Sequence, residues 1–118
     1  MADPQTETMV FDGDTTKSIT GITSNLWLMA IGLPPTWDES EDVDVWVKIR
    51  SDQPLAAPCS DTDGPITFTG DNYTVDDVAG GNLILGGKIS SPITELKVVS
   101  SGAQTGTVYP RLSRLKAV

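Results

Sequence analysis

The side chains with the clearest chemical potential are carboxylates, which occur in three short clusters, Asp12-Gly13-Asp14, Asp61-Thr62-Asp63-Gly64 and Asp76-Asp77. Oxygen atoms at this spacing suit Ca²⁺, and the second cluster resembles the opening of a calcium-binding loop. An EF-hand loop needs a bidentate Glu at its twelfth position, where this chain has Asn72. Because Asp and Gly are also common in β-turns, we interpret the clusters as turns, with an irregular calcium site as the alternative.

Residue types that carry acid–base or nucleophilic chemistry are scarce. The chain has no histidine, and its single cysteine, Cys59, lies between Pro58 and Ser60 without a neighbouring basic residue to activate the thiol. One cysteine builds neither an internal disulfide nor a Cys/His zinc site. Two carboxylates could hydrolyse a glycosidic bond, but their spacing in the sequence selects no pair. We therefore predict a protein that is not an enzyme and that binds no cofactor or metal.

The charge is strongly acidic and unevenly distributed. The 118 residues carry a formal net charge of −8, which argues against non-specific binding to nucleic acid or to an anionic membrane surface. Residues 1–87 hold 3 basic and 15 acidic side chains, whereas residues 88–118 hold 5 basic and 1 acidic. Opposite charges at the two ends suit head-to-tail packing with copies of the chain or with another protein. A last strand with solvated outer charges is the alternative interpretation.

One segment, residues 43–50, alternates more cleanly than any other. Its odd-numbered positions are β-branched, and its even-numbered positions are polar or aromatic, which is typical of a strand with one face in a core. We therefore predict that this strand lies at the centre of an antiparallel sheet. The two sets are Val43, Val45, Val47 and Ile49 against Asp44, Trp46, Lys48 and Arg50.

The rest of the chain predicts short strands separated by Gly- and Pro-rich turns. We expect a flexible arm (1–8), a hairpin (9–23, turn at 12–16) and a buried strand (25–33) ended by Pro34-Pro35. An exposed acidic loop (36–42) precedes the alternating strand, and a long connection (51–65) follows it. The next part predicts a meander with strands at 66–69, 73–78 and 82–85 and turns at 70–72 and 79–81, and the Gly pairs 80–81 and 86–87 are interpreted as hairpin turns. A strand (93–100), a loop (101–106) and a last strand (107–115) complete the plan. Pro110 places the last strand at an edge or a bulge. Residues 9–118 thus predict one all-β domain, an antiparallel β-sandwich or jelly roll of about eight short strands.

The three tryptophans raise the question of a binding surface. We expect Trp27 in the core, because the run around it is apolar on both alternating faces. Trp46 faces away from the β-branched residues and Trp37 begins the acidic loop, so either ring could pack in a second layer, stack on a sugar or anchor a protein contact.

The segment Ile93-Thr-Glu-Leu-Lys-Val-Val-Ser-Ser-Gly-Ala-Gln-Thr-Gly-Thr-Val-Tyr109 and the short Thr/Gly-rich strands resemble small virion accessory proteins of tailed bacteriophages, the decoration or cement class. The resemblance covers roughly the C-terminal half. It implies a β-sandwich or jelly-roll domain that sits on an assembled capsid, often as a trimer, and ties neighbouring major capsid proteins together.

These features together predict a structural virion protein that binds the major capsid protein or another virion protein at several points and forms a homo-oligomer, with a trimer favoured. The N-terminal residues lack a secretory signal, so we expect synthesis in the host cytoplasm, no secretion and a place in the virion. The expected contact residues are Trp37, Arg111, Leu112, Arg114, Leu115 and Lys116. A carbohydrate-binding or receptor-binding module that uses Trp37 and Trp46 is the alternative.

Overall fold

The computed structural model describes residues 8–22, 26–49, 65–75, 83–85 and 92–113, and within these ranges it is entirely β. Six antiparallel strands are present there: β1 (Met9–Ile19), β2 (Trp27–Gly32), β3 (Val43–Ile49), β4 (Ile66–Phe68), β5 (Leu83–Ile84) and β6 (Ile93–Ser113). None of the described residues forms a helix that is long and apolar enough to span a membrane. The predicted all-β, antiparallel class is therefore confirmed.

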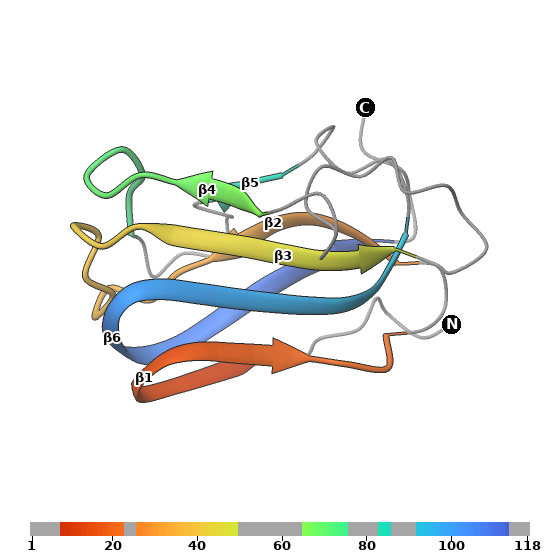
Figure 1. The fold of residues 1–118 in the computed structure, drawn as a ribbon, viewed down its shortest axis with the longest axis horizontal. Helices are drawn as coiled ribbons and strands as arrows, with labels where there is room; N and C mark the ends of the chain where they lie inside the picture. Colours follow the sequence, from red (N-terminus) through yellow and green to blue (C-terminus); the bar gives the residue numbers. More distant parts are fainter. Residues whose placement is uncertain (1–7, 23–25, 50–64, 76–82, 86–91, 114–118) are drawn as a thin grey trace.

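The sheet is organised around β6, a strand of 21 residues that pairs with three others. The strand order is β4-β3-β6-β2-β5, and β1 runs along β6. In Figure 1, β6 passes beside β3, turns at one end of the molecule and returns behind it, and β1 follows the same bend. One strand therefore contributes to both walls of the fold.

The two halves of β6 have different neighbours. Residues 93–100 pair with β3, and residues 109–113 pair with β2. β1 accompanies both halves and changes register near Asp12 and Asp14, where Gly13 adopts a φ of 77°. Such bulges bend a strand. The result is one continuous, nearly closed, barrel-like sheet, and a division into two separate sheets, as in the predicted sandwich, is not evident.

The core lies between the two walls and receives side chains from every strand pair. The alternation predicted for residues 43–47 is confirmed, because Val43, Val45 and Val47 are at most 1% exposed. β3 is an interior strand between β4 and β6, but the centre of the sheet, predicted at this strand, is β6, because β6 is long enough to pair with three others. Other fully buried side chains come from both walls, and they include Phe11, Leu28, Ile31, Leu33, Leu83, Leu85, Leu96, Val98 and Val108.

Two predicted turns are not turns in the structure. Residues 9–19 form one bent strand, because Asp14 accepts a hydrogen bond from the Asp12 N–H (3.0 Å) and the extra residues are absorbed as a bulge. Residues 101–106, predicted as a loop, continue β6, because Gln104 is buried and hydrogen-bonded and β1 pairs alongside. The prediction of two C-terminal strands was therefore wrong.

Other boundaries follow the sequence signals. β2 ends at Gly32, before the two prolines, and a turn lies at residues 70–72, where the Asn72 N–H donates to the Thr69 carbonyl (3.0 Å). β5 confirms part of the strand expected near residue 85, but residues 73–75 are not a strand. Pro110 lies beyond the last described β1 pair, Met9 with Val108, and pairs only with β2 within the described chain. The predicted arm and the 51–65 connection lie outside the described residues, except for Thr8 and Pro65.

Candidate protein interface

Trp37 was expected to offer an exposed aromatic anchor, but its ring is in the core. The side chain is 3% exposed and meets Phe11 edge-to-face, with ring centroids 5.0 Å apart. Its indole N–H donates to the Tyr73 hydroxyl (3.2 Å). Burial of the ring and of its only donor is the reason that Trp37 presents no aromatic surface in this structure.

Of the predicted C-terminal contact residues, the structure describes two, and they lie on opposite faces of β6. Leu112 is 7% exposed and pairs with Leu28 on the inner face. Arg111 pairs with Ala30 on the outer face and is partly exposed. Arg114, Leu115 and Lys116 lie outside the described residues. Alternation along the strand therefore leaves Arg111 as the described member that can reach a partner.

Pairing registers place Arg111 within a larger outer surface, which we call the Tyr109 face. Residues opposite each other in an antiparallel pair project to the same side of the sheet. Tyr109 pairs with Gly32, Arg111 with Ala30, and Ala30 in turn with Ile84. Val10, which pairs with Thr107, extends this side onto β1. The Tyr109 face therefore consists of outward positions on four strands: Val10, Ala30, Gly32, Ile84, Thr107, Tyr109 and Arg111.

This face holds every large apolar side chain that is exposed in the described parts of the chain. These are Val10 and Ile84, each 58% exposed, and Tyr109, 46% exposed. Gly32 and Ala30, which lie between these strands in the register, are themselves buried. Arg111 supplies the one formal charge among the seven residues, and its Nε is covered and has no hydrogen-bond partner within the described ranges. Contiguous exposed apolar surface marks contact sites more often than does scattered apolar exposure.

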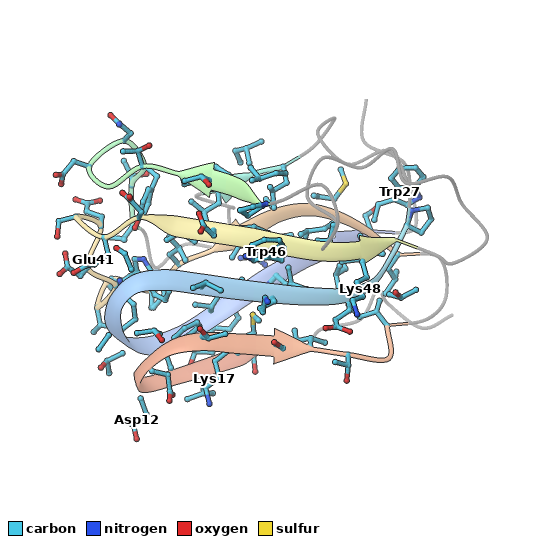
Figure 2. All side chains as sticks on the ribbon, viewed as in Figure 1. Asp12, Lys17, Trp27, Glu41, Trp46 and Lys48 are labelled. Atoms are coloured by element: carbon cyan, nitrogen blue, oxygen red, sulfur yellow. The ribbon has the colours of Figure 1, made fainter. Side chains whose placement is uncertain are left out.

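The opposite wall presents a different outer surface, the Trp46 face, made of Asp44, Trp46, Lys48, Glu95, Lys97 and Val99. Each β3 residue faces one from β6: Asp44 pairs with Val99, Trp46 with Lys97 and Lys48 with Glu95. The Lys97 Nζ lies 5.0 Å from the centroid of the Trp46 ring, a cation–π distance. Figure 2 shows Trp46 on the wall formed by β3 and the first half of β6. Mixed charge and a covered ring make this face less apolar than the Tyr109 face.

A third surface, the acidic end, gathers the carboxylates of the loop before β3 and of the turn after β4: Asp38, Glu39, Glu41, Asp42 and Asp71. Most of these carboxylates hold the chain's own loops. Asp42 Oδ1 accepts from the Gly70 N–H (2.7 Å), Glu39 Oε2 from the Val75 N–H (3.2 Å), and Glu41 Oε1 from the Ser101 hydroxyl (2.7 Å). A side chain on Gly70 would overlap the Ser40 carbonyl oxygen, so these loops also need glycine for their close approach.

Two groups at the acidic end have shifted pKa values, Asp38 and Tyr73. The hydroxyl and the backbone N–H of Ser40 both donate to Asp38 Oδ1 (2.6 and 3.0 Å) and lower the pKa of that carboxyl. Burial raises the pKa of Tyr73, whose hydroxyl donates to the Glu41 carbonyl. Both groups therefore keep their ordinary charge state near neutral pH, which suits a fixed negative surface.

The buried Gln104 connects the acidic end to the bend of β6. Its side-chain oxygen accepts from the Asp38 N–H (2.8 Å), and its amide nitrogen donates to the Asp38 carbonyl (3.1 Å) and to the Ser100 hydroxyl (3.0 Å). Gln104 is 2% exposed. Sequence analysis missed this residue because it lay in a predicted loop.

The carboxylates do not converge on a metal site in the described ranges, which contain no group of three or more acidic or cysteine side chains placed to hold an ion. Asp12 and Asp14 belong to the bulge of β1, where Asp14 also contacts Lys17 at 3.4 Å. The clusters at 61–64 and 76–77, like Cys59, lie outside the described residues. Trp27, which was expected in the core, is only half-buried.

Sequence analysis also missed Val10, Ile84 and Tyr109. Each lay in a predicted strand, but no signal in the sequence states which strands pair, so their common face was not visible there. Comparison with known proteins adds no identification, because no protein-family model, no curated protein and no solved structure matches this chain.

Proposed function

We propose that this chain is a structural virion protein that decorates or cements a bacteriophage capsid by binding the major capsid protein or another virion protein. The observation that carries the proposal is the Tyr109 face, on which the three large apolar side chains exposed among the described residues, Val10, Ile84 and Tyr109, gather. Such a surface supplies the protein contacts through which copies of the chain join and attach to a virion. Exposed Tyr with adjacent Arg is typical of the residues that dominate protein–protein binding energy. The finer architecture expected of such proteins, a β-sandwich or jelly roll, belongs to the same proposal.

An exposed face of the sheet is well suited to this role. A specific contact of standard size buries about 800 Å² on each partner, which a small domain can supply from one face and its edges. If several copies are joined, simultaneous attachment raises the apparent affinity without any new kind of contact. We therefore propose a homo-oligomer, with a trimer favoured, on the virion.

The alternative function, a carbohydrate-binding or receptor-binding module, is favoured by the partial exposure of Trp46. Lys97 lies over that ring, so a sugar that stacked on the covered side would have to displace the lysine. Trp37, the other ring assigned to sugar binding, is buried. A glycan array with hits that vanish in Trp46→Ala and persist in Tyr109→Ala would support the module over the virion protein.

The direct test is co-sedimentation of the purified protein with capsids of the phage that encodes it, prepared without this protein. We expect saturable binding at a fixed number of copies per capsid. Tyr109→Lys should abolish binding, because a charge in the apolar surface breaks the protein contacts on which multivalent attachment depends. Val99→Lys on the Trp46 face should bind as the unmodified protein does. Absence of binding to those capsids, or equal loss in both variants with both still folded, would contradict the proposal.

A further inference from the structure

We propose that the Tyr109 face is covered by a second copy of this chain, which docks with its acidic end in a head-to-tail contact. The inference deepens the proposed function, because it rests on the proposed homo-oligomer and names the two surfaces that join its copies. It assigns the Tyr109 face to the contact between copies, so the virion protein would bind other surfaces of the assembled oligomer.

The Tyr109 face carries one positive charge, on Arg111, that no carboxylate of the described residues neutralises. Arg111 lies in the row between Tyr109 and Ser113, and its neighbours across the sheet, Ala30 and Ile84, are apolar. No carboxylate among the described residues forms an ion pair with it, and its Nε lacks any acceptor. A guanidinium that lies against the sheet loses little freedom on binding, and it presents a fork that a carboxylate can fill through two hydrogen bonds. An acidic surface on a partner would therefore complement the Tyr109 face.

The acidic end carries an excess of negative charge, which complements the positive charge of Arg111. Residues 34–47, 65–75 and 98–110 contain no Lys or Arg, so the carboxylates of these segments have no basic neighbour among them. Hydrogen bonds to Gly70 and Val75 fix one oxygen of Asp42 and one of Glu39, which leaves the second oxygen of each as an acceptor in a set position. Figure 2 places Glu41, and with it this surface, at the end of the molecule opposite Trp27. Preorganised acceptors lower the entropic cost of association.

The two surfaces lie on different parts of the fold, so their contact is heterologous. One copy's Tyr109 face meets its neighbour's acidic end, and the neighbour's own Tyr109 face stays open for the next copy. Such contacts close into a ring when the rotation between copies allows it. The ring favoured by the proposed function is a trimer. An isologous contact between two Tyr109 faces would instead join two surfaces that each carry Arg111 and no carboxylate, so neither charge would find an acidic partner.

The test uses the whole chain and sedimentation velocity at several concentrations. We expect the unmodified protein to sediment as a species of three times its 12.5 kDa chain mass. Arg111→Gln should weaken association by at least ~30-fold, whereas Lys97→Gln, the matched loss of one charge from the Trp46 face, should leave it unchanged. A variant of the acidic end, Glu39→Gln with Asp42→Asn and Asp71→Asn, keeps the hydrogen-bond acceptors and should also fail to associate.

The decisive experiment mixes the two defective variants. Each should be monomeric alone, but a mixture retains one intact pair of surfaces, because the Tyr109 face of the acidic-end variant can meet the acidic end of Arg111→Gln. A heterodimer in the mixture is the expected result. A mixture that stays monomeric, or an unmodified protein that is monomeric at ~100 µM, overturns the inference. If the protein is monomeric and still co-sediments with capsids, the inference is wrong and the proposed function stands. If the protein forms the oligomer and does not co-sediment with capsids, the inference stands and the proposed function is wrong.

Discussion

The first and second halves of β6 share one strand and one alternation of inner and outer residues, but their outer surfaces differ. The first half contributes Glu95 and Lys97 to a face of mixed charge, where Lys97 lies over Trp46. The second half contributes Tyr109 and Arg111 to an apolar face with one charge. Alternation decides which side chains are buried, but the neighbouring strands decide what the exposed ones become. We therefore propose that the outer surface of the second half contacts other proteins and that the outer surface of the first half faces solvent.

The largest expected effect tests the alternation that both halves share. Val98→Lys would bury an unpaired charge at a site that is 0% exposed, and we expect it to lower the free energy of unfolding by more than ~4 kcal/mol. Val99→Lys, one residue along and opposite Asp44, should change that free energy by less than ~1 kcal/mol. Urea denaturation followed by tryptophan fluorescence measures both. Similar losses in the two variants would contradict the assigned faces.

The next effect concerns the bend that joins the two halves. Gln104→Met keeps the side-chain volume but removes three hydrogen bonds, to the Asp38 N–H and carbonyl and to the Ser100 hydroxyl. We expect the free energy of unfolding to fall by about 2–3 kcal/mol. Thr105→Met, at the exposed neighbouring position, should cost less than ~0.5 kcal/mol. An equal cost in the two variants would mean that Gln104 does not hold the bend.

The third prediction asks whether the outer faces differ in binding. Tyr109→Ala should weaken association between copies, or with capsids, by about 2 kcal/mol, or ~30-fold, because it removes an aromatic anchor. Its effect on the unfolding of the dissociated chain should stay within ~0.5 kcal/mol, since the ring is 46% exposed. Trp46→Ala is the control and should leave association unchanged. Analytical ultracentrifugation measures association, and urea denaturation measures the free energy of unfolding. A greater loss of association in Trp46→Ala than in Tyr109→Ala would contradict the assignment of binding to the Tyr109 face.

A smaller effect distinguishes the basic residues of the two faces. A double-mutant cycle of Lys97→Met and Trp46→Leu should give a coupling free energy of about 0.5–1 kcal/mol from the cation–π contact. The same cycle with Arg111→Met and Tyr109→Leu should give none in the dissociated chain, because Lys97 lies over Trp46 whereas no such contact is seen between Arg111 and Tyr109. A coupling of equal size in both cycles would remove this difference between the halves.

The smallest expected effect is a pH dependence that belongs to the acidic end. Hydrogen bonds from Ser40 lower the pKa of Asp38 below 3.8, its ordinary value. The folded state therefore binds this proton less readily than the unfolded state. The associated stability is present above pH 3.8 and is lost as the pH falls through 3.8 toward the folded-state pKa. Ser40→Ala should flatten this part of the stability curve, measured by urea denaturation from pH 6 to pH 3, whereas Ser113→Ala should not.

The sequence predicted the fold class and part of the strand plan. Alternation from Val43 to Val47 identified an interior strand, and Pro34-Pro35 marked the end of β2, because both signals are local. The turn expected at Asp12-Gly13-Asp14 failed, since a bulge uses the same residues as a turn and only the partner strand distinguishes them. Similarly, the loop expected at 101–106 is strand because β1 pairs with it.

The candidate interface was less accessible from the sequence, because a surface depends on which strands pair. Arg111 was predicted as a contact residue and does lie on the outer face, whereas the side chains of Trp37 and Leu112 are buried by neighbours distant in the chain. The sequence by itself determined the acidic charge and the absence of histidine, which follow from residue counts, and the β class, which follows from local periodicity. Only the tertiary structure brought Val10, Ile84 and Tyr109 to one side, because strand register is set by pairing over long sequence separations.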